Sequence, residues 1–361
     1  MAKKIKQPLT KAEKRKKRRK TLIIIEVIIL LIVVAFLVAW LKFGLISCED
    51  LGDLSKNKLS TDTIDLLKGY KCIAFFGVDN RSNGNFESGN SDSIMVACIN
   101  NDTKEVRVIS LYRDTALMMK DNVIRKCNYA YNHGGYQEAI EMLNRNLDLD
   151  IQEYIAVDFN ALSDVIDDVG GVEIDLTAEE AKLMNNDYIG EVASITGKHS
   201  DGVAAGHQTL NGVEATAYCR LRYTSGGDFK RAERQRTVLS QIVNKVKNMS
   251  AAQALKLATD ENVLKEISTS LSASEIATLA SALRDYNLGA TSGFPFDKTT
   301  GTYGSKGSLV VPCTLDTNVS KLYFFLFNKE GYVPSEEVKK ISRDIVDLTG
   351  KTEKNAEVDE Y

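Results

Sequence analysis

The chain has 361 residues, of which 43% are hydrophobic and 26% charged, an ordinary composition for one large or two modest globular domains. The net charge of −3 hides an asymmetry. Residues 1–20 carry eleven Lys or Arg and one acid, about +10, which leaves about −13 for the rest. An acidic body repels phosphate backbones, and the basic segment has no aromatic residue for base stacking, so these features argue against a nucleic-acid regulator.

Residues 21–41 are predicted to form one transmembrane helix. The segment is almost wholly apolar, and as a helix it spans roughly 30 Å, the thickness of a bilayer core. Its one charge, Glu26, either reaches the nearby interface or marks a helix–helix contact, and Trp40 stands where an interfacial anchor is expected. By the positive-inside rule, residues 1–20 are a cytoplasmic head and the chain after Lys42 is extracellular. The sequence thus predicts a single-pass protein of the cell membrane.

A cleaved lipoprotein signal ending at Leu45-Ile46-Ser47-Cys48 is the alternative for this end of the chain. Against it, the apolar run is longer than the roughly 7–15 residues of a signal segment, and Lys42 interrupts the approach to the cysteine. A buried core helix is the other alternative, but a soluble fold does not need twenty such residues beside a strongly basic tail. With either a spanning helix or a lipid anchor, the main body lies outside the membrane.

The cysteines and histidines suggest neither a zinc site nor a thioredoxin motif. None of the six cysteines forms a C-x-x-C pair, and an outward-facing domain permits disulfides whose pairing the sequence leaves open. The apolar, strand-like surroundings of Cys72, Cys98 and Cys219 favour buried free thiols there. The three histidines lack metal-ligand spacing and are interpreted as loop or surface residues: His133, His199 and His207.

Strand and helix patterns alternate after the membrane segment. Residues 42–69 are predicted to be an extracellular stalk with a short helical stretch, and residues 332–361 a C-terminal tail that is polar after about Asp344. Apolar runs bounded by turn residues predict strands at 71–78, 93–99, 106–111, 154–159, 172–176, 218–223 and 305–311. Helical spacing and capping signals predict helices at 136–147, 160–168 (capped by Asn160), after Thr177, 211–216, 229–247, within 251–287 (capped by Ser274) and 319–327.

This alternation predicts an α/β sandwich with a central mixed sheet. No linker rich in Pro, Gly or Ser divides residues 70–331, so they are predicted to form a single domain. Open α/β sheets place their ligands at strand ends, and three charged segments lie there: 77–81 with 91–93, 110–114, and 220–236. Asp79 and Asp92 in the first segment are hard oxygen ligands that suit Mg²⁺.

The 220–236 run predicts an anion site. Arg220 and Arg222 are two apart in the predicted strand, so they share a face, and Arg231 and Gln235 are four apart on the next helix. Guanidinium groups converging beside a helix N-terminus suit phosphate oxygens. Together with Arg113, these residues predict a site for a phosphate or pyrophosphate group.

At this point the chain resembles the LytR-CpsA-Psr family, which attaches phosphate-linked glycopolymers to bacterial cell walls. The resemblance covers about residues 70–331 and rests on these runs: I-A-F-F-G-V-D-N-R, S-D-S-I-M-V, V-I-S-L-Y-R-D-T, C-N-Y-A-Y-N-H-G-G, D-D-V-G-G-V-E-I-D, L-N-G-V-E-A, and Y-C-R-L-R-Y followed by G-D-F-K-R-A-E-R-Q. It implies a Mg²⁺-dependent phosphotransferase that moves an anionic glycopolymer (teichoic acid, capsule or another glycan) from an undecaprenyl-pyrophosphate carrier to a peptidoglycan hydroxyl. Undecaprenyl phosphate is then released.

The resemblance also implies residue roles. Asp79 and Asp92 match the Mg²⁺ ligands, and Asp79 is a candidate acceptor of the hydroxyl proton, although a metal-held Asp is a poor base. The pyrophosphate-binding set is Arg81, Arg113, Arg220, Arg222, Arg231 and Gln235, with Asp228 beside it to orient an arginine. Arg113, Arg220 and Arg222 are expected to be catalytic together with Asp79. Many members carry Arg where this chain has Asn90, so Arg125 or Lys126 is a candidate replacement. The lipid needs an apolar slot, for which residues 139–166 are candidate walls.

Two rival functions use the same residues. A non-catalytic polyprenyl-phosphate binding or sensing module would bind through the arginines without requiring a metal. A membrane-tethered pyrophosphatase would use water in place of the sugar hydroxyl.

Overall fold

A seven-stranded mixed sheet forms the centre of the part of the chain that the computed structural model describes, residues 47–49, 51–52, 54–79, 86, 89–258, 260, 263, 265–282 and 285–357. The strand order is β1 (Ser47–Cys48), β10 (Ile267–Thr269), β7 (Glu153–Val157), β2 (Tyr70–Asp79), β3 (Asn90–Asn100), β4 (Glu105–Leu111) and β11 (Asn287–Phe294). β3 runs antiparallel to both β2 and β4, whereas β2 pairs with β7, and β4 with β11, in parallel. The predicted mixed sheet is therefore confirmed.

The predicted head and transmembrane helix, residues 1–20 and 21–41, lie outside the described residues. Within the described ranges, no helix is both long enough and apolar enough to cross a bilayer.

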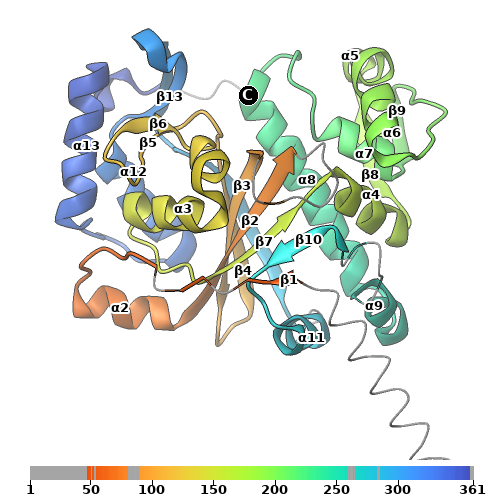
Figure 1. The fold of residues 1–361 in the computed structure, drawn as a ribbon, viewed down its shortest axis with the longest axis horizontal. Coiled ribbons are helices and arrows are strands. Elements are labelled where there is room, and N and C mark those ends of the chain that lie inside the picture. The colour runs from red at the N-terminus through yellow and green to blue at the C-terminus, as the bar shows by residue number, and fades with distance from the viewer. Residues whose placement is uncertain are drawn as a thin grey trace, which may run out of the picture. The chain divides into compact units, whose positions relative to one another are not determined.

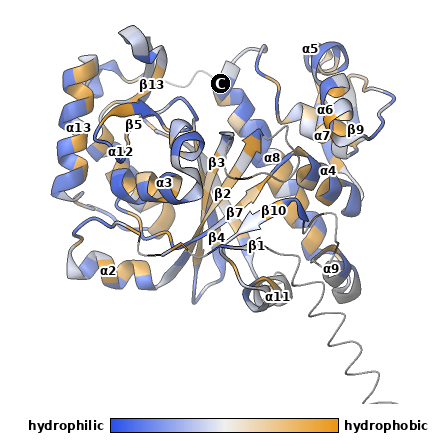
Figure 2. Ribbon diagram, in the orientation of Figure 1, coloured by the Kyte–Doolittle hydropathy of each residue, from blue (hydrophilic) through white to orange (hydrophobic). Residues whose placement is uncertain are grey.

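Helices cover both faces of the sheet (Figure 1). One layer consists of α2 (Thr61–Lys68), α3 (Tyr129–Leu147), α12 (Leu315–Phe327) and α13 (Glu336–Thr349), and the other contains α4 (Phe159–Asp168) and α8 (Gly227–Lys247). Side chains alternate along β2, so that Phe76 packs on Tyr131 of α3 while Phe75 contacts the cluster that includes Leu239 of α8. Figure 2 shows the central strands coloured hydrophobic, as expected for a sheet buried on both faces.

A smaller core lies beside the α8 layer. Its elements are β8 (Val172–Leu176), α5 (Ala178–Leu183), the π-helical turn Met184–Tyr188, α6 (Ile189–Thr196), β9 (Gly206–Leu210) and α7 (Gly212–Tyr218). Buried side chains such as Ile174, Met184, Leu210 and Leu221 pack there against Val238 of α8. This core holds the end of α7 and the start of α8 next to the sheet. The remaining elements are β5 (Ala116–Met118), β6 (Ile124–Lys126), α9 (Ala251–Ala258), α11 (Ala273–Ala282), β12 (Lys298–Thr302), β13 (Ser308–Pro312) and the 3-10 turns Gly304–Lys306 and Glu353–Asn355.

The predicted strand at 218–223 is wrong. The chain leaves α7 through a turn in which the amide of Arg220 donates to the Ala217 carbonyl (3.0 Å), and residues 221–226 form a loop without strand pairing. The apolar alternation of this run arises because Leu221 enters the small core while its neighbours point elsewhere. Arg220 and Arg222 therefore meet the site from a loop, not from one face of a strand.

Three further predictions differ from the structure. Asp158, not Asn160, caps α4, because its Oδ1 accepts from the Ala161 amide (2.9 Å). The 251–287 segment contains strand β10 between α9 and α11, and Ser272, not Ser274, precedes α11 and accepts from the Glu275 amide.

Residues of the expected stalk and of the expected C-terminal tail both pack into the folded domain. In the stalk, Leu51 and Leu67 are buried and β1 joins the sheet edge. In the tail, α13 is amphipathic and places fully buried side chains, including Ile341 and Ile345, in the main core. Among the described residues after Asp344, Asp347 is exposed on that helix, and the 3-10 turn Glu353–Asn355 follows it.

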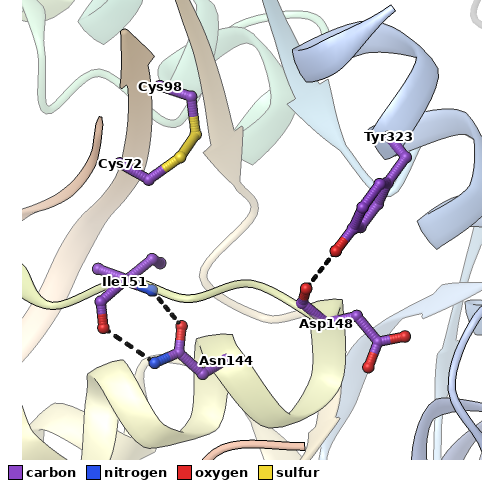
Figure 3. Close-up of a disulfide and its surroundings, with 6 residues drawn as sticks. All are labelled: Cys72, Cys98, Asn144, Asp148, Ile151 and Tyr323. Carbon is purple, nitrogen blue, oxygen red and sulfur yellow. Dashed lines mark hydrogen bonds between the residues drawn. A yellow bond between two sulfur atoms is a disulfide. The ribbon is translucent and has the colours of Figure 1, made fainter. Parts of the chain in front are cut away.

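Cys72 and Cys98 form a disulfide between β2 and β3, which corrects the prediction of free thiols at both positions (Figure 3). They are directly opposed in the strand register, and a single strand's composition does not reveal that register. Cys219 is a buried free thiol, as predicted, and burial raises its pKa to about 12. Figure 3 also shows Asn144 of α3, whose side chain bonds the amide (2.8 Å) and carbonyl (3.0 Å) of Ile151 and so fixes the approach to β7.

Replacing both cysteines of this disulfide with serine should lower the free energy of unfolding by about 2–4 kcal/mol, because the bridge closes a chain segment with a sequence separation of 26. Denaturant unfolding would measure this difference. Reductant should lower the stability of the wild type to that of the double variant and leave the variant unchanged. Equal stability of the oxidised wild type and the variant would contradict the assignment.

Candidate functional site

A β-bulge positions Asp92. In the β2–β3 register, Gly77 pairs with Ser93 and Val78 pairs with Ser91, so Asp92 is the extra residue of β3. If side chains simply alternated along β3, residue 92 would point to the same face of the sheet as Ile94, which lies in the main core. The bulge turns its carboxylate to the opposite face, next to Ser93, under the start of α8. The sequence run S-D-S therefore delivers a carboxylate to the site through a local irregularity of the strand.

Two arginines hold the two carboxylate oxygens of Asp92. Arg113 Nη1, from the loop after β4, lies 2.6 Å from Oδ1, and Arg222 Nη2 lies 2.7 Å from Oδ2. Burial would raise the pKa of Asp92, but Arg113, Arg231 and Arg222 together keep it below its usual value. Burial likewise opposes the charge of Arg113, and the neighbouring carboxylates of Asp92 and Asp228 raise its pKa despite it. Both side chains therefore remain ionised at neutral pH.

Arg231 of α8 is the most deeply buried cation of the cluster, with 3% of its surface exposed. Its Nη2 lies 2.9 Å from Asp228 Oδ1 and donates to the Asp92 carbonyl (3.3 Å). Its Nε and Nη1 have no hydrogen-bond acceptor among the described residues. Burial, with further contributions from Arg113 and Arg222, lowers its pKa to about 10, so it remains charged at neutral pH. A buried guanidinium with unpaired donors indicates that an anion belongs beside it.

Asp228 also contacts a second arginine of the cluster. Its Oδ1 lies 3.4 Å from Arg113 Nε and 2.9 Å from Arg231 Nη2. Asp228 is predicted to orient one arginine, and in the structure its carboxylate contacts two.

Arg220 approaches from the turn after α7, and Gln235 from the third turn of α8. Arg220 Nη1 lies 3.1 Å from Glu191 Oε2, and its guanidinium lies over the Phe159 ring, 4.7 Å from the centroid. The side-chain amide of Gln235 donates to the Cys219 carbonyl (3.3 Å), which ties α8 to the end of α7. Sequence reasoning missed Glu191, because it comes from a distant segment without any motif, and it did not predict the contact between Arg220 and Phe159.

The cluster opens into an apolar pocket between the sheet and α8. The pocket is lined by Asp92, Arg220, Arg222, Arg231 and Gln235. The other walls are apolar side chains of β2, β3, β7, α4 and α8: Phe75, Met95, Ile155, Val157, Phe159, Leu162, Val238, Leu239 and Ile242. One cavity therefore combines cationic groups with a lipid-like lining.

The expectation that residues 139–166 line an apolar slot is half right. Ile155, Val157, Phe159 and Leu162 line the pocket, whereas the α3 part of that segment packs into the main core on the other face of the sheet. Gly77 also lines the pocket, and its lack of a side chain avoids crowding Ser93, because a Cβ at residue 77 would lie 3.0 Å from Ser93 Cβ.

The remaining predicted residues are placed as follows. Asp79 is the last residue of β2, opposite Asn90 and beside the bulge that carries Asp92. Arg81 lies outside the described residues. Lys126 approaches the cluster, since its Nζ lies 3.2 Å from Asp114 Oδ1, and that oxygen is 3.9 Å from Arg113 Nε. Arg125 instead pairs with Asp121 (2.7 Å) and lies over the Tyr129 ring, so of the two candidate replacements only Lys126 faces the cluster.

Asp79 and Asp92 are candidate magnesium ligands at this end of the sheet. Asp79 and Asp92 come from neighbouring strands, and carboxylate oxygens are the ligands Mg²⁺ prefers. Each Asp92 oxygen bound by an arginine keeps a further lone pair. The described residues include no cluster of three or more His, Cys, Asp or Glu side chains able to hold a metal, so phosphate oxygens and water would have to complete the coordination.

A family model for the LytR_cpsA_psr family matches residues 47–295, more than half of the chain. The chain belongs to the LytR_cpsA_psr family. The match includes β1 and part of the expected stalk, in agreement with the sheet, and it ends inside the domain, before α12 and α13.

Curated and structural relatives are consistent with this family. The chain is 29% identical over 261 residues to the polyisoprenyl-teichoic acid–peptidoglycan teichoic acid transferase TagV of Bacillus subtilis, covering 67% of this chain and 64% of TagV. It thus spans less than two thirds of that relative's length. Protein gbs0355 of Streptococcus agalactiae has a similar fold, with a TM-score of 0.63, 23% identity, and coverage of 77% of this chain and 94% of its own. A solved structure of TagT bound to LI-WTA gives a TM-score of 0.55 at 18% identity, with 82% and 99% coverage.

Proposed function

We propose that this LytR_cpsA_psr protein transfers an anionic glycopolymer from a polyprenyl-diphosphate carrier, undecaprenyl pyrophosphate, to a hydroxyl of peptidoglycan. The observation that carries the proposal is a single cavity lined both by arginines, one buried and two partly buried, and by apolar side chains. A polyprenyl diphosphate has the same division, with a charged group on a long hydrocarbon. The relatives named as teichoic acid transferases support an anionic polymer as the transferred group.

The arginines supply orientation and charge stabilisation. Arg222 and Arg231 would bind the diphosphate oxygens, with Arg220 and Arg113 beside them, and Gln235 would add an amide donor. The acceptor oxygen forms a bond to the phosphorus that carries the polymer, the bond from that phosphorus to the oxygen of the lipid phosphate breaks, and undecaprenyl phosphate leaves. The hydroxyl proton passes to a nearby base, for which Asp79 is the candidate. Fixed guanidiniums favour the charge that develops during such an in-line displacement.

Magnesium fits the charge balance of the cluster. Arg113, Arg222 and Arg231 face Asp92 and Asp228, which leaves three cations against two anions, or about +1. A diphosphate diester brings two negative charges. With the carboxylate of Asp79 included, the sum is about −2. Mg²⁺ held by Asp79 and Asp92 would neutralise this charge and polarise the phosphoryl oxygens when bound.

The proposed location is the outer side of the cell membrane, with residues 21–41 as the anchor. The Cys72–Cys98 disulfide supports this, because disulfides persist mainly in oxidising compartments outside the cytoplasm. The pocket would then receive its lipid from the outer leaflet.

A reconstituted transfer assay tests the proposal. The full chain in lipid vesicles, with polyprenyl-diphosphate-linked polymer, peptidoglycan glycan strands and Mg²⁺, should produce peptidoglycan-linked polymer. Asp79→Asn should lower turnover at least about 10²-fold, because it removes a carboxylate that is a proposed metal ligand and proton acceptor. The affinity for the lipid should stay within a few fold, because the apolar walls are unchanged.

The rival functions give other outcomes in the same assay. A binding or sensing module would give no product with the wild type or with Asp79→Asn, and its lipid binding would not depend on Mg²⁺. A pyrophosphatase would cleave the carrier at the same rate with and without the glycan acceptor.

A further inference from the structure

Tyr223 is an unusual surface residue. Its side chain is 77% exposed, the largest exposure among the large hydrophobic side chains of the described residues. It follows Arg222 directly, yet Arg222 lines the pocket and Tyr223 does not. An aromatic ring therefore stands in solvent at the edge of the arginine cluster.

The loop that carries Tyr223 is held from beneath by a buried arginine. Arg234 of α8 is 2% exposed, and its guanidinium donates to the Leu221 carbonyl (3.2 Å) and to Thr224 Oγ1 (2.6 Å). Glu180 of α5 accepts from Arg234 Nε at 2.9 Å and completes the anchor. The loop is thus bonded on both sides of Tyr223, at the Leu221 carbonyl and at the Thr224 hydroxyl.

The outer edge of the loop is fixed as well. The Gly227 amide donates to the Thr224 carbonyl (3.1 Å), which joins the loop to the first turn of α8. An exposed ring on a backbone fixed at both ends loses little conformational entropy when a partner stacks on it.

In-line geometry indicates which partner meets this ring. The leaving lipid phosphate is connected to the hydrocarbon in the apolar pocket, so the attacking oxygen must approach the phosphorus from the opposite, solvent side. Tyr223 is exposed to solvent, directly follows a residue of the pocket lining, and is not part of the apolar walls. Its ring is therefore accessible to an acceptor that arrives from solvent, and it does not contact the proposed lipid site.

We propose that Tyr223 is the acceptor platform of this enzyme: a sugar ring of the peptidoglycan strand stacks its apolar C–H face on the phenol ring, which holds the acceptor hydroxyl next to Arg222. This inference rests on the proposed function. A tyrosine offers a large rigid apolar face at low entropic cost, and its hydroxyl remains solvated at the rim. Tyr223 is a positioning residue for the acceptor and contributes nothing to lipid binding.

Kinetics with the full chain in vesicles tests this role. The variants are Tyr223→Ala, Tyr223→Phe and the matched control Phe324→Ala, which removes an exposed aromatic ring (54%) from α12 on the other layer of the sheet. Tyr223→Ala should raise the KM for glycan strands roughly 5- to 10-fold, as expected for the loss of one stacking contact. The KM for the lipid-linked donor, the rate of donor cleavage by water and the melting temperature should all stay at wild-type values.

The other variants complete the test. Tyr223→Phe should keep the wild-type acceptor KM, because stacking does not need the hydroxyl, and Phe324→Ala should change nothing. An unchanged acceptor KM in Tyr223→Ala, or a rise in the donor KM instead, would overturn the inference while wild-type transfer still supports the proposed function. Absence of any transfer by the wild type would overturn the proposed function itself, and this inference with it.

Discussion

Arg222→Ala should reduce transfer at least about 10²-fold and leave the fold intact. Arg222 donates to Asp92 and lines the pocket, so its loss removes one of the guanidiniums positioned for the diphosphate. Its side chain is 36% exposed and comes from a loop that Arg234 fixes independently, so the melting temperature should change little. The measurement is kcat/KM for the lipid-linked donor together with thermal unfolding.

An exposed arginine of α13 provides the matched control. Arg343→Ala removes the same charge from the surface of the chain, away from the pocket lining, and should retain wild-type transfer. If Arg222→Ala transferred as well as Arg343→Ala, the arginine cluster would have no part in the reaction.

Asp92→Asn should separate binding from turnover. Both of its oxygens are bound by arginines that the diphosphate would also need, so the carboxylate competes with the substrate. Without Mg²⁺, in EDTA, the variant should therefore bind polyprenyl diphosphate more tightly than the wild type does. With Mg²⁺, turnover should fall at least about 10²-fold, because the variant loses a proposed metal ligand and the charge that aligns Arg113 and Arg222.

The loss of the Asp92 charge should also lower the stability of the protein. Removing the charge leaves the buried Arg231 with Asp228 as its remaining carboxylate partner and beside two other arginines, so the free energy of unfolding should fall by about 1–3 kcal/mol, and the lipid diphosphate should restore part of it. Asp121→Asn, which alters a more exposed carboxylate paired with Arg125, is the control. If Asp92→Asn bound polyprenyl diphosphate more weakly than the wild type in EDTA, or turned over at the wild-type rate, the Asp92 carboxylate would not compete with the diphosphate for the arginines as proposed.

Much of the fold was predictable because local patterns determine it. The apolar runs that became β2, β3, β4 and β7 are flanked by turn residues, and the capping box at Thr177 forms as predicted. Short or polar strands were missed, as with β9 (Gly206–Leu210), because they lack a buried apolar face that alternation would reveal. The false strand at 218–223 has the opposite cause, since the buried Cys219 and Leu221 are two residues apart among polar neighbours and so imitate alternation.

The site residues were predictable as types but not as an arrangement. The arginine–aspartate composition and the family resemblance identified Arg113, Arg222, Arg231 and Asp228, and the structure brings them within contact distance of one another or of Asp92. Two features depend on tertiary structure and had no sequence signal. One is the bulge that turns Asp92 to the pocket face, and the other is the register that joins Cys72 to Cys98.

The most direct test of the central claim is a crystal structure of residues 46–361 with a polyprenyl diphosphate. The hydrocarbon should lie between β2, β7 and α8, and the diphosphate oxygens should lie within hydrogen-bond distance of Arg220, Arg222 and Arg231, with Arg231 Nε or Nη1 gaining the partner it lacks. Density for the lipid elsewhere, or a diphosphate out of reach of these guanidiniums, would contradict the account.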